Sequence, residues 1–160
     1  FCFILIRFPL IWSVSKSSVN RYWGLAIPFQ TNQWLPLALG ILAGIQSGLV
    51  NCKTEYLLSV PCDVPNLPKN LCEILYKDLI KNNSDCVMPY TINNNKTKRT
   101  HPVILLLKSK FANSLNEFIK NGGRKIDSWT KTLNTSEVFF YDENSFLNIN
   151  KLEDIEKIFK

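Results

Sequence analysis

Short apolar runs recur along this chain, and segments with helical periodicity separate them. The clearest runs are YLLSV at Tyr56–Val60 and PVILLL at Pro102–Leu107, each bounded by polar residues. Continuous apolar runs of this length are typical of strands that lie inside a sheet and are covered on both faces. The alternation therefore predicts an α/β fold, in which a mostly parallel sheet is flanked by helices.

The remaining elements are predicted from the same patterns. The first run, FCFILIRFPLIWSV, is interpreted as a buried strand, and NNNKTKR at 93–99 as a polar turn. Further extended segments are expected at Asp85–Pro89, Val138–Tyr141 and Phe146–Ile149. Helices are expected at Ser15–Leu25, Pro36–Val50, Leu67–Lys81, Lys110–Lys120, Lys125–Leu133 and Lys151–Phe159.

Length and composition bound the organisation of the chain. The 160 residues contain no repeat and no linker-like stretch, so residues 1–160 are expected to form a single domain. The 46% hydrophobic and 20% charged fractions are those of a soluble globular protein. The first apolar run is interrupted by Arg7 and Pro9, so no membrane span is expected.

Charge and cysteine content narrow the classes of partner. The net charge of +6 favours an anionic partner, but the lysines are scattered rather than striped, so no nucleic-acid partner is expected. None of the five cysteines forms a CxxC pair, and the single histidine, His101, lies in a different segment, so a zinc site is not supported. An odd cysteine count without a disulfide pattern fits a reducing, cytoplasmic location.

The segment VPCDVPNLP places a lone carboxylate, Asp63, directly after a predicted strand and between Pro61 and Pro65. Ligands of open α/β sheets bind beyond the carboxyl ends of the strands, and a carboxylate there is a suitable ligand for Mg²⁺. The alternative is an aspartate with a turn or capping role, which is a common use of this residue beside proline. Asp63 stands too early to cap a helix that begins near Pro68.

Two other segments carry candidate binding groups. In FLNINKLEDI, Asn148 and Asn150 are two residues apart, so an extended chain would point both amides the same way. The alternative for Asn150 is a simple helix cap. In NGGRKIDSW, Arg124 and Lys125 follow a glycine pair and suit an anionic group, although solvated surface cations are the commoner case.

Taken in order, these segments resemble the molybdenum cofactor guanylyltransferase family, whose versions read approximately GPLAGILAGL, PCDxPFLP, HPVFAL, GxRKVxxW and FFNINTPEDL. The resemblance extends from about Ser15 to Lys160. The matching stretches of this chain are PLALGILAGIQSGL, VPCDVPNLP, HPVILLL, GGRKIDSW and FLNINKLEDI.

The resemblance implies a Rossmann-like nucleotidyltransferase fold and a reaction in which GMP passes from GTP to molybdenum-bearing molybdopterin. Mg²⁺ would be the cofactor, and insertion proteins or acceptor molybdoenzymes would be later partners. By motif match, Asp63 would be the catalytic metal ligand and Asn150 the opposite ligand. The nucleotide would lie against Gly40, Gly44, Pro61 and Asp63, and the pterin against Arg124, Lys125, Asn148 and Asn150.

One family segment has no counterpart in this sequence: the glycine-rich loop LAGGxSxRMGxDK, which in the family surrounds the GTP phosphates. The resemblance therefore implies an N-terminally truncated version of the fold. Two functions follow as expectations. One is an active guanylyltransferase; the alternative is a catalytically inactive family member that keeps the fold and binds a pterin or a partner.

Overall fold

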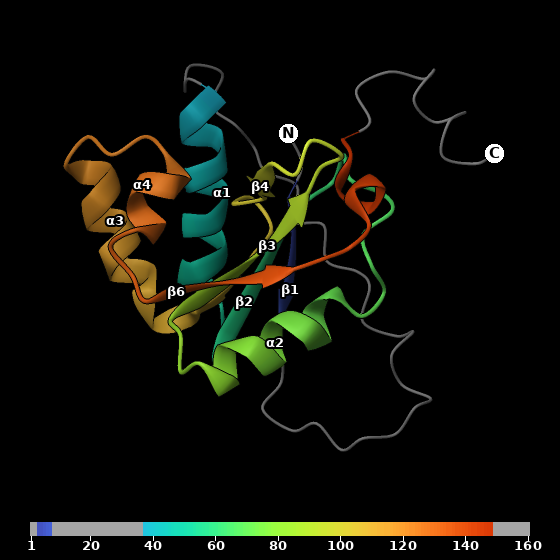
Figure 1. Ribbon diagram of the computed structural model, residues 1–160. Helices are drawn as coiled ribbons and strands as arrows, with labels where there is room; N and C mark the ends of the chain where they lie inside the picture. Colours follow the sequence, from blue (N-terminus) through green and yellow to red (C-terminus); the bar gives the residue numbers. More distant parts are fainter. Residues whose placement is uncertain (1–2, 8–36, 149–160) are drawn as a thin grey trace.

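The computed structural model describes residues 3–7 and 37–148 (Figure 1). The strands are β1 (Phe3–Arg7), β2 (Tyr56–Pro61), β3 (Cys86–Ile92), β4 (Lys98–Thr100), β5 (Leu105–Lys108) and β6 (Thr135–Phe139). The α-helices are α1 (Leu37–Val50), α2 (Leu71–Lys81), α3 (Ala112–Lys120) and α4 (Ile126–Thr130), and two 3₁₀ turns are η2 (Ser109–Phe111) and η3 (Glu143–Phe146). No helix in this part of the chain is long and apolar enough to cross a bilayer.

The strands form one sheet in which β1, β2, β5 and β3 lie side by side. Both β5 and β4 pair antiparallel with β3. The strand β5 pairs with the first residues of β3, and β4 pairs with the last residues of β3. The remaining strand, β6, pairs with β3 in parallel. Because β4 and β6 both pair with Tyr90, they must occupy opposite edges of β3.

The expected α/β arrangement, with helices flanking a sheet, is confirmed, but within residues 3–7 and 37–148 the sheet is mixed rather than mostly parallel. β2, β3 and β6 run the same way, whereas β5 runs against both of its neighbours. The physical reason is the connection from β3 to β5, which holds the short strand β4 and no helix. A parallel return requires a crossover, usually helical, of a dozen or more residues.

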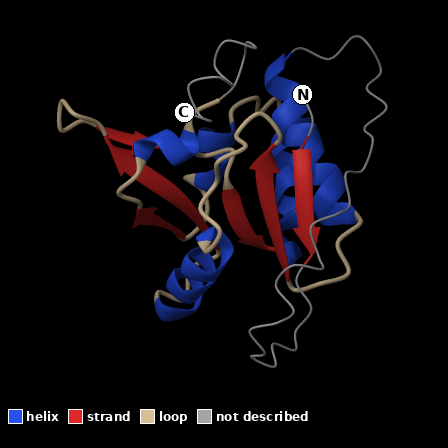
Figure 2. Ribbon diagram, turned by 90° about the vertical axis from the view of Figure 1, so that its right-hand side faces the viewer, coloured by secondary structure: helices blue, strands red, loops and turns tan. Residues whose placement is uncertain are grey.

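Two hydrophobic layers cover the two faces of the sheet. α1, α3 and α4 lie on one side and α2 on the other (Figures 1 and 2). The central strand β5 contributes to both layers, since Leu105 and Leu107 pack with the α1 side and Leu106 packs with the α2 side. All three leucines are fully buried, which confirms the prediction of a strand covered on both faces.

Several predicted boundaries are wrong by a few residues. The helix expected from Leu67 begins at Leu71, because a residue before proline avoids the helical region and Leu71 N–H instead closes a turn onto Pro68 O at 2.9 Å. The strand expected from Pro102 begins at Leu105, because Ile104 N–H closes a similar turn onto His101 O at 2.9 Å.

Other differences lie towards the C-terminus. The helix expected at Lys125–Leu133 is limited to α4, and the strand expected at Val138–Tyr141 is β6, which pairs with β3 from Thr135 onward. Phe146 belongs to η3 rather than to an extended piece. The last two residues of the expected NNNKTKR turn belong to β4. The helices expected at Ser15–Leu25 and Lys151–Phe159 lie outside the described residues.

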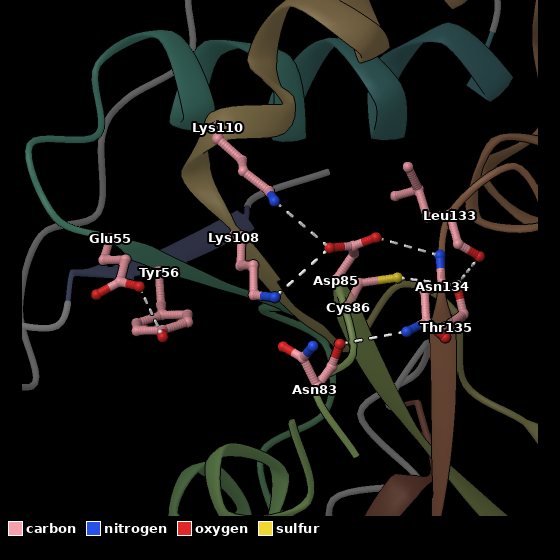
Figure 3. Close-up of polar contacts among 10 residues, drawn as sticks. All are labelled: Glu55, Tyr56, Asn83, Asp85, Cys86, Lys108, Lys110, Leu133, Asn134 and Thr135. Carbon is pink, nitrogen blue, oxygen red and sulfur yellow. Dashed lines mark hydrogen bonds and ion pairs between the residues drawn. The ribbon is translucent and has the colours of Figure 1, made fainter. Parts of the chain in front are cut away.

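At the amino end of β3, a cluster of polar side chains connects β3 with β5 and β6 (Figure 3). Asp85 Oδ1 lies 3.5 Å from Lys108 Nζ and 3.7 Å from Lys110 Nζ, and Asp85 Oδ2 accepts from the backbone N–H of Asn134 at 3.4 Å. Beside it, Cys86 Sγ and Thr135 Oγ1 are 3.0 Å apart. The start of β3 is thereby tied to the end of β5 and to the start of β6.

Candidate functional site

A cleft of about 450 Å³ opens where β2 ends and where the chain passes from β4 to β5. This is the edge of the sheet at which ligands of open α/β folds bind. Between Thr100 and Leu105 the chain belongs to neither β4 nor β5. This connection forms one wall of the cleft, and the end of β2 forms another. The lining residues are Ile41, Pro61, Cys62, Asp63, Val64, Arg99, Thr100, His101, Pro102, Val103, Ile104, Phe146 and Asn148.

Asp63 stands in the turn that follows β2 and is one of the residues that line this cleft. Its Oδ2 accepts a hydrogen bond from Asn148 Nδ2 at 3.2 Å. Its Oδ1 is buried and has no hydrogen-bond partner among the described residues. A buried carboxylate oxygen without a donor is energetically unfavourable, and such a group ordinarily has a ligand or a water as its partner.

The Asp63–Asn148 pair provides a test of whether Mg²⁺ fits. The described residues contain no cluster of three or more His, Cys, Asp or Glu side chains able to hold a metal. Mg²⁺ does not need one, because it is commonly bound through one or two carboxylates together with water and substrate phosphates. The free oxygen of Asp63, with an amide group beside it, fits a metal held in that way.

Arg99 and His101 belong to the other wall of the cleft. Arg99 Nη1 lies 3.9 Å from Glu143 Oε1, and the Arg99 side chain is half exposed. Burial, and to a smaller degree the charge of Arg99, lowers the pKa of His101 to about 4, so the imidazole is neutral at physiological pH. The sequence does not indicate that His101 lines a cleft, because the apolar pattern only places it directly before a predicted strand.

Of the other predicted nucleotide-binding residues, only Pro61 lines the cleft. Gly40 is in the first turn of α1, next to the lining residue Ile41, and a side chain added at Gly40 would meet no atom within 4 Å. Gly44 is buried one turn further along α1 and is not among the lining residues. Among the described side chains of α1, therefore, Ile41 is the one that borders the cleft.

The predicted pterin-binding residues are not all brought together. Asn148 is in the cleft, whereas Arg124 and Lys125 are in the connection between α3 and α4 and do not line it. The guanidinium of Arg124 donates to the carbonyls of Ile119, at 3.3 Å, and Gly123, at 2.9 Å, at the end of α3. Asn150 lies outside the described residues.

Comparisons with known proteins identify relatives that match most of the chain. The family model described as "MobA-like NTP transferase domain" matches residues 8–136. The chain is 36% identical over 144 residues to the molybdenum cofactor guanylyltransferase of Bordetella petrii, with 90% of this chain and 72% of the relative covered. It is also 36% identical over 148 residues to the protein of that name in Ralstonia pickettii, with the same coverage of 90% and 72%.

Solved structures give the same fold. The molybdopterin-guanine dinucleotide biosynthesis protein A of Archaeoglobus fulgidus superposes with a TM-score of 0.57 at 25% identity. The superposition covers 72% of this chain and 59% of the Archaeoglobus chain. The Aquifex aeolicus protein Aq1419 superposes with a TM-score of 0.58 at 20% identity. The superposition covers 69% of this chain and 56% of the Aquifex chain. The chain thus spans less than two thirds of each of these two structures.

Proposed function

Since the chain belongs to the family of MobA-like NTP transferase domains, we propose that it transfers GMP from GTP to molybdenum-bearing molybdopterin and releases pyrophosphate. An oxygen of the molybdopterin phosphate forms a bond to the α-phosphorus of GTP. The bond from that phosphorus to the bridging oxygen of the β-phosphate breaks, and pyrophosphate leaves with the electron pair. The product is the guanine dinucleotide form of the cofactor.

The observation that carries this proposal is the unpartnered Oδ1 of Asp63, which is buried at the cleft and has no donor among the described residues. Phosphoryl-group transfer depends mainly on positioning and on stabilising charge at the phosphate oxygens. Bound Mg²⁺ would supply that charge. Asp63 would hold it from the protein side, with Asn150 as the opposite ligand and with Asn148 bonded to Asp63 Oδ2. The apolar side chains of Val64 and Ile41 would limit the access of water.

The names of the relatives support the choice of substrates. Two relatives that match 90% of this chain are called molybdenum cofactor guanylyltransferase, which implies GTP as donor and a form of molybdopterin as acceptor. We extend the proposal to a cytoplasmic location, and to insertion proteins or acceptor molybdoenzymes as the recipients of the product.

The test is pyrophosphate release by the intact chain from GTP, with molybdopterin, molybdate and Mg²⁺ present, and with CTP and ATP in parallel reactions. We expect GTP to be preferred, a chelator to abolish turnover, and Asp63→Asn to lower kcat about 100-fold or more. The matched control is Glu117→Gln, which makes the same chemical change at an exposed position of α3, outside the cleft. It should keep the wild-type rate.

Unchanged turnover in Asp63→Asn would remove Asp63 from the mechanism. An intact chain that binds molybdopterin, measured by quenching of pterin fluorescence, but releases no pyrophosphate would instead be the inactive family member.

A further inference from the structure

The segment that brings Asn148 to Asp63 depends on one buried ring. Phe146 ends η3 and is only 2% exposed, whereas Asn148, two residues later, is exposed. The ring of Phe146 stacks on the ring of His101, with 4.7 Å between centroids and 24° between planes. It also meets Phe140 edge-on at 5.3 Å. These two ring contacts fix the point from which the chain continues to Asn148.

His101 is itself fixed from the sheet. Its Nε2 lies 3.0 Å from Thr91 Oγ1, and the Thr91 side chain is fully buried on β3. Its backbone N–H donates to Pro89 O at 3.0 Å, and its carbonyl accepts from Ile104 N–H at 2.9 Å. The imidazole therefore has a defined place between β3 and η3.

We propose that His101 is a positioning residue, which holds Phe146 and thereby keeps the Asn148 amide within hydrogen-bond reach of Asp63. His101 acts in this role through its stacked ring and its bond to Thr91, without contact to a reacting atom. Burial, which lowers the pKa of the imidazole, agrees with a role in which the ring packs on Phe146 and bonds to Thr91. The effect of this role on metal binding and turnover rests on the proposed function. The contacts of His101 and Phe146 themselves are independent of that function.

The first readout is the side-chain amide resonance of Asn148 in a ¹⁵N-labelled protein without ligands, assigned with Asn148→Ser. Asp63→Ala removes the acceptor and defines the position of the unbonded signal. We expect His101→Ala and Phe146→Leu to move the resonance towards that position. His101→Phe keeps a ring on Phe146 and should move it less. Leu115→Ala, a cavity in the opposite layer, should leave it in place even though it destabilises the fold.

The second readout is the Mg²⁺ concentration that gives half-maximal pyrophosphate release. Residues that orient metal ligands typically change metal affinity or activity by 10–100-fold, so we expect His101→Ala to raise this concentration about 10-fold, with His101→Phe restoring most of the loss. Leu115→Ala should not change it.

The outcomes separate the two hypotheses. An Asn148 resonance that stays at the wild-type position in both His101→Ala and Phe146→Leu overturns the positioning role, whatever the activity. If instead these variants move the resonance but the wild-type chain releases no pyrophosphate, the positioning role stands and the proposed reaction fails.

Discussion

At the scale of single residues, Ser59 and Asp63 share an unusual property: each has a buried side-chain oxygen with no hydrogen-bond partner in the described part of the chain. They differ in position. Asp63 lines the cleft, whereas Ser59 is fully buried within β2 and is not a lining residue. A ligand can satisfy the first oxygen, but the second remains a cost to stability.

Ser59→Ala is therefore expected to raise the free energy of unfolding, by up to about 1 kcal/mol, because it removes a buried hydroxyl that has no partner. Urea denaturation measures the change. The matched control is Ser136→Ala, which breaks a 2.6 Å hydrogen bond to Asp78 and should lower the free energy of unfolding by about 1–2 kcal/mol. If both variants lose stability, Ser59 has a partner that the geometry does not reveal.

His101 predicts a pH dependence of stability. Its pKa falls from 6.5 to about 4 on folding, so between these pH values the unfolded chain binds a proton that the folded chain does not. The free energy of unfolding must then decrease as the pH falls through this window. The groups around the imidazole are Arg99 on β4, Thr91 on β3 and Phe146 on η3, of which only Arg99 carries a charge.

We expect the free energy of unfolding, measured in urea at about pH 7 and pH 5, to fall more steeply in the wild type than in His101→Gln, which cannot titrate. Comparing the two slopes cancels the contributions of the carboxylates, which both proteins share. Equal slopes would mean that His101 titrates normally in the folded chain.

At the scale of the elements, the cluster around Asp85 decides how β3, β5 and β6 meet. Asp85→Asn keeps an oxygen to accept from Asn134 N–H but removes the attraction to Lys108 and Lys110. Lys108 is the more buried of the two lysines, so its pair should contribute more. We expect the free energy of unfolding to fall by about 1 kcal/mol at low salt, and by less in about 1 M NaCl, where surface charges are screened.

Urea titrations at the two salt concentrations test this expectation. Glu73→Gln is the control, because its i,i+4 pair with Lys77 is far more exposed and should contribute less than about 0.5 kcal/mol. An Asp85→Asn variant as stable as the wild type at low salt would show that the backbone bonds alone fasten these strands.

At the scale of the whole molecule, β5 is the strand on which both hydrophobic layers depend. Leu106 packs towards α2 and Leu107 towards α1, and each is fully buried. Truncating a buried leucine removes transfer free energy and leaves a cavity, so Leu106→Ala and Leu107→Ala should each lower the free energy of unfolding by about 2–5 kcal/mol. Leu147→Ala, at a 40% exposed position, should change it little. A small loss in only one core variant would mean that its layer is loosely packed.

The helices and strands of the core follow from local pattern, which is why the sequence predicts them well. The continuous apolar run at Pro102–Leu107 predicts a strand that is covered on both faces. The spacing of the apolar residues in Leu67–Lys81 predicts one buried helical face, and Leu71, Leu75 and Leu79 are the buried residues of α2. Strand direction is not a local property. Nothing within the apolar run itself indicates that β5 runs antiparallel to both neighbours; that depends on how the chain returns from β3.

The candidate site shows the same division. Asp63 is predictable because a carboxylate stands directly after a buried strand. The places of His101 and Arg99 cannot be predicted from the sequence. These residues reach the cleft only through the antiparallel pairing of β4 with β3 and the turn that follows β4. The pairing of Asn148 with Asp63 joins residues 85 positions apart and depends on the tertiary contacts of Phe146.

The wall that faces Asp63 has one further consequence. Pro102 and Val103 line the cleft, yet they stand between Thr100, fixed in β4, and Leu105, fixed in β5. Neither belongs to the two buried layers. Substitutions at these two positions can change the shape and polarity of the cleft while Asp63, on the opposite wall, stays where it is. Selection, or an engineer, can therefore alter what this cleft accepts without first having to rebuild the protein that holds it.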